Sequence, residues 1–230
     1  MAGRDEDRLW LSRTELARLR RTLGENHPRT LAARANVAGE LWRLGRLEDS
    51  AAAYRPVVEA RQRVLGAAHL DTLNSQNDLA AVLAALWRME EAEVEFRQVV
   101  ELRREALGDD HVATLESRHG LARTLLILQR YPEAQEEQST VVAARRRVLG
   151  ADHPATLASR ILWAVTLELV GRLEGAEAEH RAVLEGCRRV LGEDHPDTAA
   201  SRDGLARVLR AQERFDEAEA AAGGPHGGWP

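Results

Sequence analysis

Histidine is the residue whose spacing first suggests chemistry in this 230-residue chain. Five histidines recur at intervals of 42 residues: His27, His69, His111, His153 and His195. Imidazole often binds metals, but all ligands of one ion must lie about 2 Å from it. Equivalent positions of stacked helical repeats lie on the order of 10–20 Å apart, since packed helices are ~8–10 Å apart. These histidines therefore cannot converge on one metal, and we expect each to have a structural role at the start of a helix.

The remaining residues form no recognisable catalytic motif. All 32 basic residues are arginine, so the lysine of a GxxxxGK[ST] phosphate-binding loop or of a Schiff base is missing. A single cysteine, Cys187, excludes an intramolecular disulfide and a multi-cysteine zinc site, and we interpret it as an incidental substitution. We therefore expect no catalytic residues, no metal, no cofactor and no enzymatic activity.

Charge and hydropathy limit the partners. The net charge of −5 provides no basic field that would hold nucleic acid. No segment approaches the ~18 uninterrupted apolar residues of a membrane-spanning helix, and residues 1–23 lack the apolar core of a secretion signal. We expect neither nucleic-acid nor membrane partners, and we predict a cytoplasmic location.

The histidines belong to a longer repeated segment that indicates the fold class. The pattern Leu-Gly-x-x-His-x-x-Thr occurs five times in phase, starting at Leu23, Leu65, Leu107, Leu149 and Leu191. Glycine commonly ends a helix, and an N-cap residue is expected two positions later, at Asn26, Asp110, Asp152 and Asp194. Each unit therefore predicts two helices, which in the first unit span about residues 28–44 and 47–65. Only 4% of the residues are aromatic, which also favours an all-helical, alanine- and leucine-rich protein.

Two positions per unit carry small side chains that would let the paired helices approach closely. The first helix has Ala38, Ala80, Ala122, Ala164 and Ala206, and the second has Ser50, Ala92, Ala134, Ala176 and Ala218. Pro56 lies inside the second helix of the first unit, where proline removes a backbone hydrogen bond. We predict a kink or an early break near residues 52–56.

These features resemble the tetratricopeptide repeat (TPR). In the second unit the positions typical of that family are held by Leu79, Ala80, Leu83, Trp87, Met89, Ala92, Phe96 and Val99. The 42-residue period and the linker are similar to the kinesin-light-chain subtype. Arrays of this kind occur in bacterial regulatory proteins, some of them joined to signal-transduction ATPases. The resemblance implies an all-α fold, a right-handed TPR superhelix (α-solenoid) of antiparallel helix pairs with about eleven helices.

The period also predicts the organisation of the chain. A capping helix, or half repeat, occupies residues 1–23 and four full repeats occupy 24–65, 66–107, 108–149 and 150–191. A partial fifth repeat spans 192–222, and a Gly/Pro tail that we expect to be disordered spans 223–230.

The resemblance further implies a binding groove on the concave surface, lined by the first helix of each unit. In the kinesin-light-chain-like subtype two successive asparagines contact extended peptide backbone, because an amide both donates and accepts. The matching positions here include Asn36, Asn77, Asp78 and His119. One turn further, the same face should carry Trp42, Arg123, Leu126, Glu168, Arg207 and Arg210. Of these, Trp42 is a candidate anchor for a partner.

We therefore expect a scaffold that binds a protein or an extended peptide on its concave groove. Two alternatives stay open: a regulatory protein that senses a short peptide, and a detached sensor segment that works with a separate signal-transduction ATPase. The fifth repeat stops early, so we expect Leu205, Val208, Leu209 and Phe215 to be partly exposed. Such a patch would support a homodimer through the C-terminal end, unless the tail folds back and Trp229 covers it.

Overall fold

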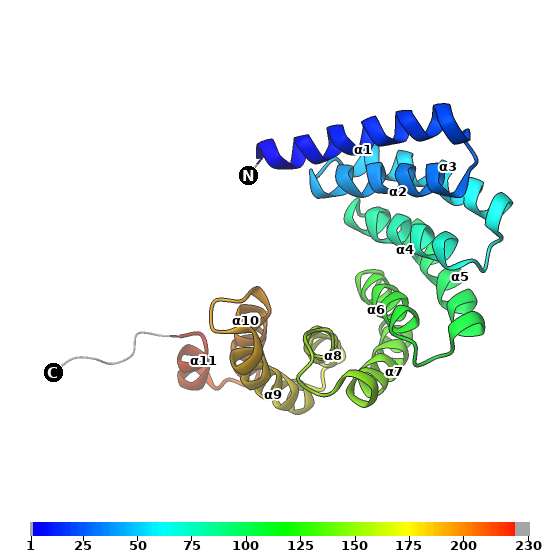
Figure 1. Ribbon diagram of the computed structural model, residues 1–230. Coiled ribbons are helices and arrows are strands. Elements are labelled where there is room, and N and C mark those ends of the chain that lie inside the picture. The colour runs from blue at the N-terminus through cyan, green and yellow to red at the C-terminus, as the bar shows by residue number, and fades with distance from the viewer. Residues whose placement is uncertain (1, 224–230) are drawn as a thin grey trace. The chain divides into compact units, whose positions relative to one another are not determined.

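The computed structural model describes residues 2–223, and the side chains from residue 6 onward. Within this range the chain forms eleven helices and no strand, as predicted (Figure 1). The helices are α1 (Ala2–Leu23), α2 (Pro28–Arg43), α3 (Leu47–Leu65), α4 (Leu70–Ala85), α5 (Met89–Leu107), α6 (Val112–Ile127), α7 (Tyr131–Leu149), α8 (Pro154–Leu169), α9 (Leu173–Leu191), α10 (Pro196–Ala211) and α11 (Phe215–Ala221). No helix among the described residues is long and apolar enough to cross a bilayer.

The chain divides into two compact units, Met1–Thr124 and Leu125–Pro230. In unit 1, consecutive helices pack against each other from α1 through α5 (α1 with α2, and so on to α4 with α5), and α2 also contacts α4 (Figure 1). In unit 2, each helix from α7 to α11 packs against the next, and α8 also contacts α10. Each unit is thus a stack of helix pairs in which the first helices of adjacent pairs touch, as in a TPR α-solenoid.

The repeated histidine is the N-cap of the first helix in each pair. The Nδ1 atom of His27 accepts a hydrogen bond from the backbone N–H two residues later at 3.2 Å, and the other four histidines do the same. An unprotonated ring nitrogen thus takes the place of the usual oxygen acceptor at this position. The prediction of Asn26, Asp110, Asp152 and Asp194 as caps was therefore wrong by one residue.

The other residues of the linker motif hold the turn between helices. Each motif glycine has a positive φ, between +86° and +99°, which suits a residue without a Cβ. The motif threonine bonds back to that turn: the Thr72 hydroxyl donates to the Gly66 carbonyl at 2.9 Å, and Thr114 and Thr198 make the same bond. The five-fold motif therefore ends one helix and starts the next, and in three of the five repeats a threonine bond joins the two.

The small-residue positions are buried, as predicted. The exposed fraction is 0% for Ala38, Ala80, Ser50 and Ala92, and it is no more than 2% for their equivalents in later repeats. Ser50 shows how close the paired helices lie, because its hydroxyl donates to the Ala38 carbonyl at 2.8 Å. The helix pair is thus joined by backbone contact at its small residues.

Pro56 does not break its helix. α3 runs without interruption for 19 residues, the same length as α5. Proline removes the bond to the carbonyl four residues earlier, which here belongs to the exposed Ala52. Water can satisfy that carbonyl, so the early break that we predicted from the sequence was wrong.

The apolar residues of the partial fifth repeat are covered, contrary to our prediction. Leu205, Val208 and Leu209 are 4%, 1% and 1% exposed. Leu205 and Leu209 share one buried cluster with Leu184 of α9 and Ala218 of α11, and Val208 shares another with Leu167 and Ala176. α11 has only seven residues, and α9 contributes Leu184 to the cluster that buries the two leucines of α10.

Phe215 is exposed, as predicted, at 60%. Three of the four residues that we expected to form an apolar dimer patch are therefore buried, and the homodimer stays a prediction. The predicted tail lies outside the described residues beyond Gly223, and so does Trp229.

Candidate functional site

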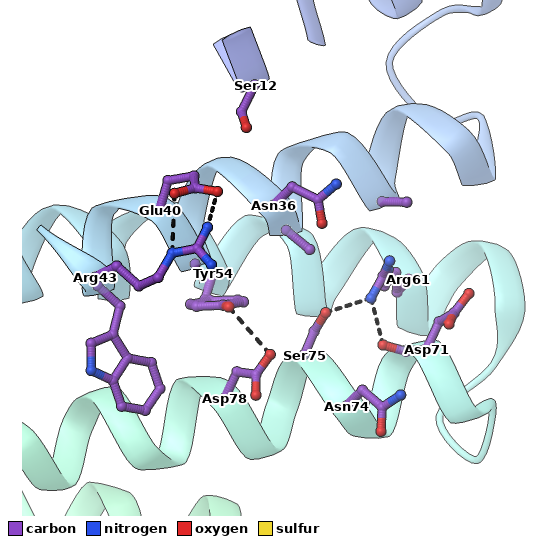
Figure 2. Close-up of a pocket in the computed structure, with 14 residues that line it drawn as sticks. Ser12, Asn36, Glu40, Arg43, Tyr54, Arg61, Asp71, Asn74, Ser75 and Asp78 are labelled. Atoms are coloured by element: carbon purple, nitrogen blue, oxygen red, sulfur yellow. Dashed lines mark hydrogen bonds and ion pairs between the residues drawn. The ribbon is translucent and has the colours of Figure 1, made fainter. Parts of the chain in front are cut away.

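A pocket of about 540 Å³ in unit 1 brings together three of the predicted binding residues (Figure 2). Its lining comes from Ser12 of α1, the inner face of α2, two residues of α3 and the first half of α4. Asn36 and Trp42 of α2 and Asp78 of α4 are the predicted residues that line it. Asn36 is exposed and Trp42 is half-buried, so both can contact a partner.

Asp78 is the most unusual group in this pocket. The Tyr54 hydroxyl of α3 donates to its Oδ2 at 3.2 Å (Figure 2). Burial raises the pKa of the Asp78 carboxyl above its ordinary value, although the Tyr54 hydrogen bond acts against that shift. Burial and the charge of Asp78 also raise the pKa of Tyr54, so the hydroxyl keeps its proton and remains the donor.

The two arginines of the pocket are engaged by other groups. Arg43 donates from Nε to Glu40 Oε2 at 3.1 Å and from Nη2 to Glu40 Oε1. Arg61 donates from Nη1 to the Asp71 carbonyl and to the Ser75 hydroxyl, both at 2.6 Å (Figure 2). Both guanidinium groups thus stabilise the wall of the pocket.

The asparagine that faces the pocket from α4 is Asn74, not Asn77. Asn77 is only 9% exposed, and its Oδ1 accepts from the Ser117 hydroxyl at 2.8 Å. Our expectation that Asn77 lines the binding groove was therefore wrong, because its buried amide joins adjacent repeats. Asn74 is exposed and lines the pocket, while its Oδ1 accepts from Arg103 Nη2 at 2.7 Å. Its spacing of four residues from Asp78, on one face of a helix, could have identified it from the sequence.

Arg61 has counterparts that sequence analysis did not recognise as structural. Arg103 and Arg145 lie 42 and 84 residues further on. Each donates from Nη1 to a carbonyl and to a serine hydroxyl of the next first helix, at 2.6–2.9 Å. In the fourth repeat this position is Cys187, which is fully buried. Burial raises the pKa of its thiol, which disfavours the thiolate that a nucleophile needs.

The other predicted site residues lie apart from this pocket. His119 is half-buried and Arg123 is exposed on α6, and neither lines the pocket. In unit 2, Leu126 is buried and Arg210 is exposed. Arg207 is exposed and donates from Nε and Nη2 to the Glu168 carboxylate, both at 3.2 Å.

Glu168 also binds a buried histidine. His180 of α9 is 0% exposed, and its Nε2 lies 2.6 Å from Glu168 Oε1. Burial raises the pKa of Glu168, but the hydrogen bonds from His180 and Arg207 outweigh it and hold the pKa below its ordinary value. Glu168 is therefore an ionised acceptor that ties together α8, α9 and α10.

The side chains around the unit 1 pocket carry several kinds of hydrogen-bonding group. They offer amides, carboxylates, hydroxyls and aromatic rings. Among the described residues, no group of three or more His, Cys, Asp or Glu side chains is arranged to hold a metal ion.

Comparisons with known proteins agree with the repeat seen in the structure. Models of the tetratricopeptide repeat match residues 30–71, 71–136 and 157–222, which is more than half of the chain. A comparison with curated proteins found no match.

Solved structures include TPR-like repeats from a protein of Podosopora anserina described as a kinesin light chain. That structure is 28% identical, with a TM-score of 0.74 over 86% of this chain and 94% of that one. BtubC (BKLC) from P. vanneervenii is 16% identical, with a TM-score of 0.78 over 95% of this chain and 88% of that one. The apo form of RapI is 13% identical, with a TM-score of 0.73 over 83% of this chain and 67% of that one. The last two show a shared fold alone. With its 42-residue helix pairs and these matches, the chain belongs to the tetratricopeptide repeat family, in its kinesin-light-chain-like form.

Proposed function

We propose that the chain is a non-catalytic interaction scaffold that binds an extended peptide segment of a protein partner across the unit 1 pocket. The observation that carries the proposal is the joint presence of Asn36, Asn74, Trp42 and Asp78 around one pocket of about 540 Å³. TPR proteins are in general interaction scaffolds, so the family supports a protein partner.

The chemistry of the lining suits an extended peptide. An extended segment leaves its backbone N–H and C=O groups unpaired, and each amide side chain can both donate and accept. The half-buried indole of Trp42 offers a large, rigid surface of the kind that anchors interfaces. The polar groups would set the position of the peptide, and the indole would supply affinity.

Selection from a random peptide library displayed on phage tests this proposal. We expect the wild-type chain to enrich a family of peptides, and we expect Trp42→Ala to weaken their binding by roughly 1–4 kcal/mol without lowering Tm. Exposed Trp10 of α1, at 65%, provides the matched control Trp10→Ala, which should bind normally. Peptides that bind equally well to Trp42→Ala and Asn36→Ala would refute the proposal.

The same peptides distinguish a scaffold from a peptide sensor. A sensor should compact when peptide binds, which small-angle scattering would detect, whereas a scaffold should keep its radius of gyration. The cytoplasmic location and a role beside a separate ATPase stay predictions.

A further inference from the structure

The balance of charge in the unit 1 pocket points to the kind of peptide that it takes. Three carboxylates line the pocket, those of Glu40, Asp71 and Asp78, together with two guanidinium groups, those of Arg43 and Arg61. The pocket therefore carries one more negative than positive group.

Among the described residues, Glu40 forms an ion pair with Arg43, whereas neither Asp71 nor Asp78 has an ion-pair partner, and Asp78 is the more buried of the two. Arg43 is held by both oxygens of Glu40, and Arg61 is held by the Asp71 carbonyl and Ser75 (Figure 2). Among residues 6–223, no arginine lies within ion-pair distance of Asp78, whose hydrogen-bond partner is the neutral hydroxyl of Tyr54. Arg103 and Arg61 act on this carboxylate only from further away, so a half-buried carboxylate without a direct ion pair lies inside a pocket that a partner can enter.

We infer that the pocket binds an arginine or lysine side chain of an extended peptide, with its cationic head at Asp78 and its peptide backbone at Asn36 and Asn74. This inference rests on the proposed function. A cation would supply the direct ion pair that Asp78 lacks, and its hydrogen bonds would be charge-assisted.

The rest of the lining fits such a side chain. Lysine and arginine carry apolar stems of three or four methylene groups that pack against apolar surface while the head stays polar. Trp42, Ala32 and Ala35 offer that surface in the same pocket, and an indole also attracts cations through its ring face. An acidic side chain would meet a carboxylate that has no direct ion pair, and an apolar one would remove water from Asp78 without pairing it.

Fluorescence polarisation with labelled synthetic peptides tests the inference. Five pools share randomised flanking positions and carry arginine, lysine, alanine, leucine or glutamate at a fixed centre. The arginine and lysine pools should bind the wild type about tenfold more tightly than the alanine pool, and the glutamate pool should bind more weakly than alanine. Arginine amide alone should bind far more weakly than the arginine pool; equal binding would overturn the peptide assignment.

Asp78→Asn is the decisive variant. Asparagine keeps an oxygen that can accept from Tyr54, so the fold should persist with a nearly unchanged Tm, because no direct ion pair is lost. The variant should bind the arginine and alanine pools equally. Asp194→Asn makes the same change of charge at an exposed residue of a unit 2 linker, and it should keep the preference for basic peptides.

Two failures can be told apart. If all five pools bind the wild type equally, and all bind Trp42→Ala more weakly, the preference for basic peptides is refuted. Peptide binding in the unit 1 pocket is then still supported. Pools that show no binding, or binding that Trp42→Ala and Asn36→Ala do not weaken, would overturn both.

Discussion

Gly204 on α10 is the site where consecutive repeats approach most closely among the described glycines. A Cβ at this position would lie 2.2, 2.6 and 2.7 Å from three ring atoms of His180. That ring is fully buried, and its Nε2 is held 2.6 Å from Glu168. The ring cannot move aside cheaply, so Gly204→Ala must displace either a helix or a buried hydrogen bond.

The expected loss of stability follows from opposing terms. Alanine is favoured over glycine inside a helix by about 1 kcal/mol. Overpacking a core costs about 1–3 kcal/mol, and losing a hydrogen bond to a charged group costs about 1.5–3 kcal/mol. Together the two costs exceed the helix gain, so we expect Gly204→Ala to lower the free energy of unfolding by about 1.5–5 kcal/mol.

Gly39 on α2 is the matched control. A Cβ there would meet only the Tyr54 hydroxyl, at the ordinary contact distance of 3.4 Å. Gly39→Ala should therefore raise stability by about 0.5–1 kcal/mol. Thermal unfolding followed by circular dichroism compares the two, since about 1 kcal/mol shifts Tm by about 2–4 °C in a chain of this size.

An unchanged or higher Tm for Gly204→Ala would refute the packing argument. Adding His180→Ala should remove the clash, so the double variant should be more stable than the sum of the two single losses predicts. Simple additivity would show that the two residues do not interact.

Three further predictions test other parts of the fold. Arg103→Met should destabilise the chain by about 2–4 kcal/mol, because buried acceptors in the next helix lose their charged donor; Arg104→Met at an exposed pair should cost less than about 0.5 kcal/mol. Equal urea midpoints for the two variants would contradict this. Trp87→Gly should raise Tm by up to the equivalent of about 1 kcal/mol, because Trp87 has a φ of +60° that glycine adopts without strain; a lower Tm would show that the exposed indole stabilises the turn. The pKa of Glu168 lies below its ordinary value of 4.5, so its stabilising contribution is present above pH 4.5 and is lost as the pH falls below it. Glu168→Gln should therefore lose less stability on acidification than the wild type, and parallel pH profiles would refute the assignment.

The fold could be predicted from the sequence because the repeated motif marks the same helix boundary five times. The motif glycine and the proline after His27 mark the end of one helix and the start of the next, and α2 and α3 begin and end within one residue of the prediction. The identity of the cap was harder to predict, because asparagine and aspartate are the usual acceptors and neighbour the histidine in sequence. Only the structure shows that the ring nitrogen reaches the backbone N–H.

The site was predicted less completely, because it depends on contacts between repeats. Asn36, Trp42 and Asp78 were found from one helix face, whereas Tyr54 belongs to the opposite helix of its pair. Tyr54 reaches Asp78, 24 residues later, and His180 at the equivalent place contacts Gly204 at the same separation. A contact between residues 24 apart links two different helices, so the periodicity within a single helix cannot predict it. The burial of Asn77 likewise depends on Ser117 of the next repeat.

The central claim is that the unit 1 pocket binds an extended peptide, and nuclear magnetic resonance of the asparagine side-chain amides tests it most directly. The chain has four asparagines, Asn26, Asn36, Asn74 and Asn77, so their signals can be assigned by single substitutions. Saturation with a phage-selected peptide should shift the amide signals of Asn36 and Asn74, which line the pocket, and leave that of the linker residue Asn26 in place. A peptide that binds tightly while both pocket signals stay unchanged would contradict the account.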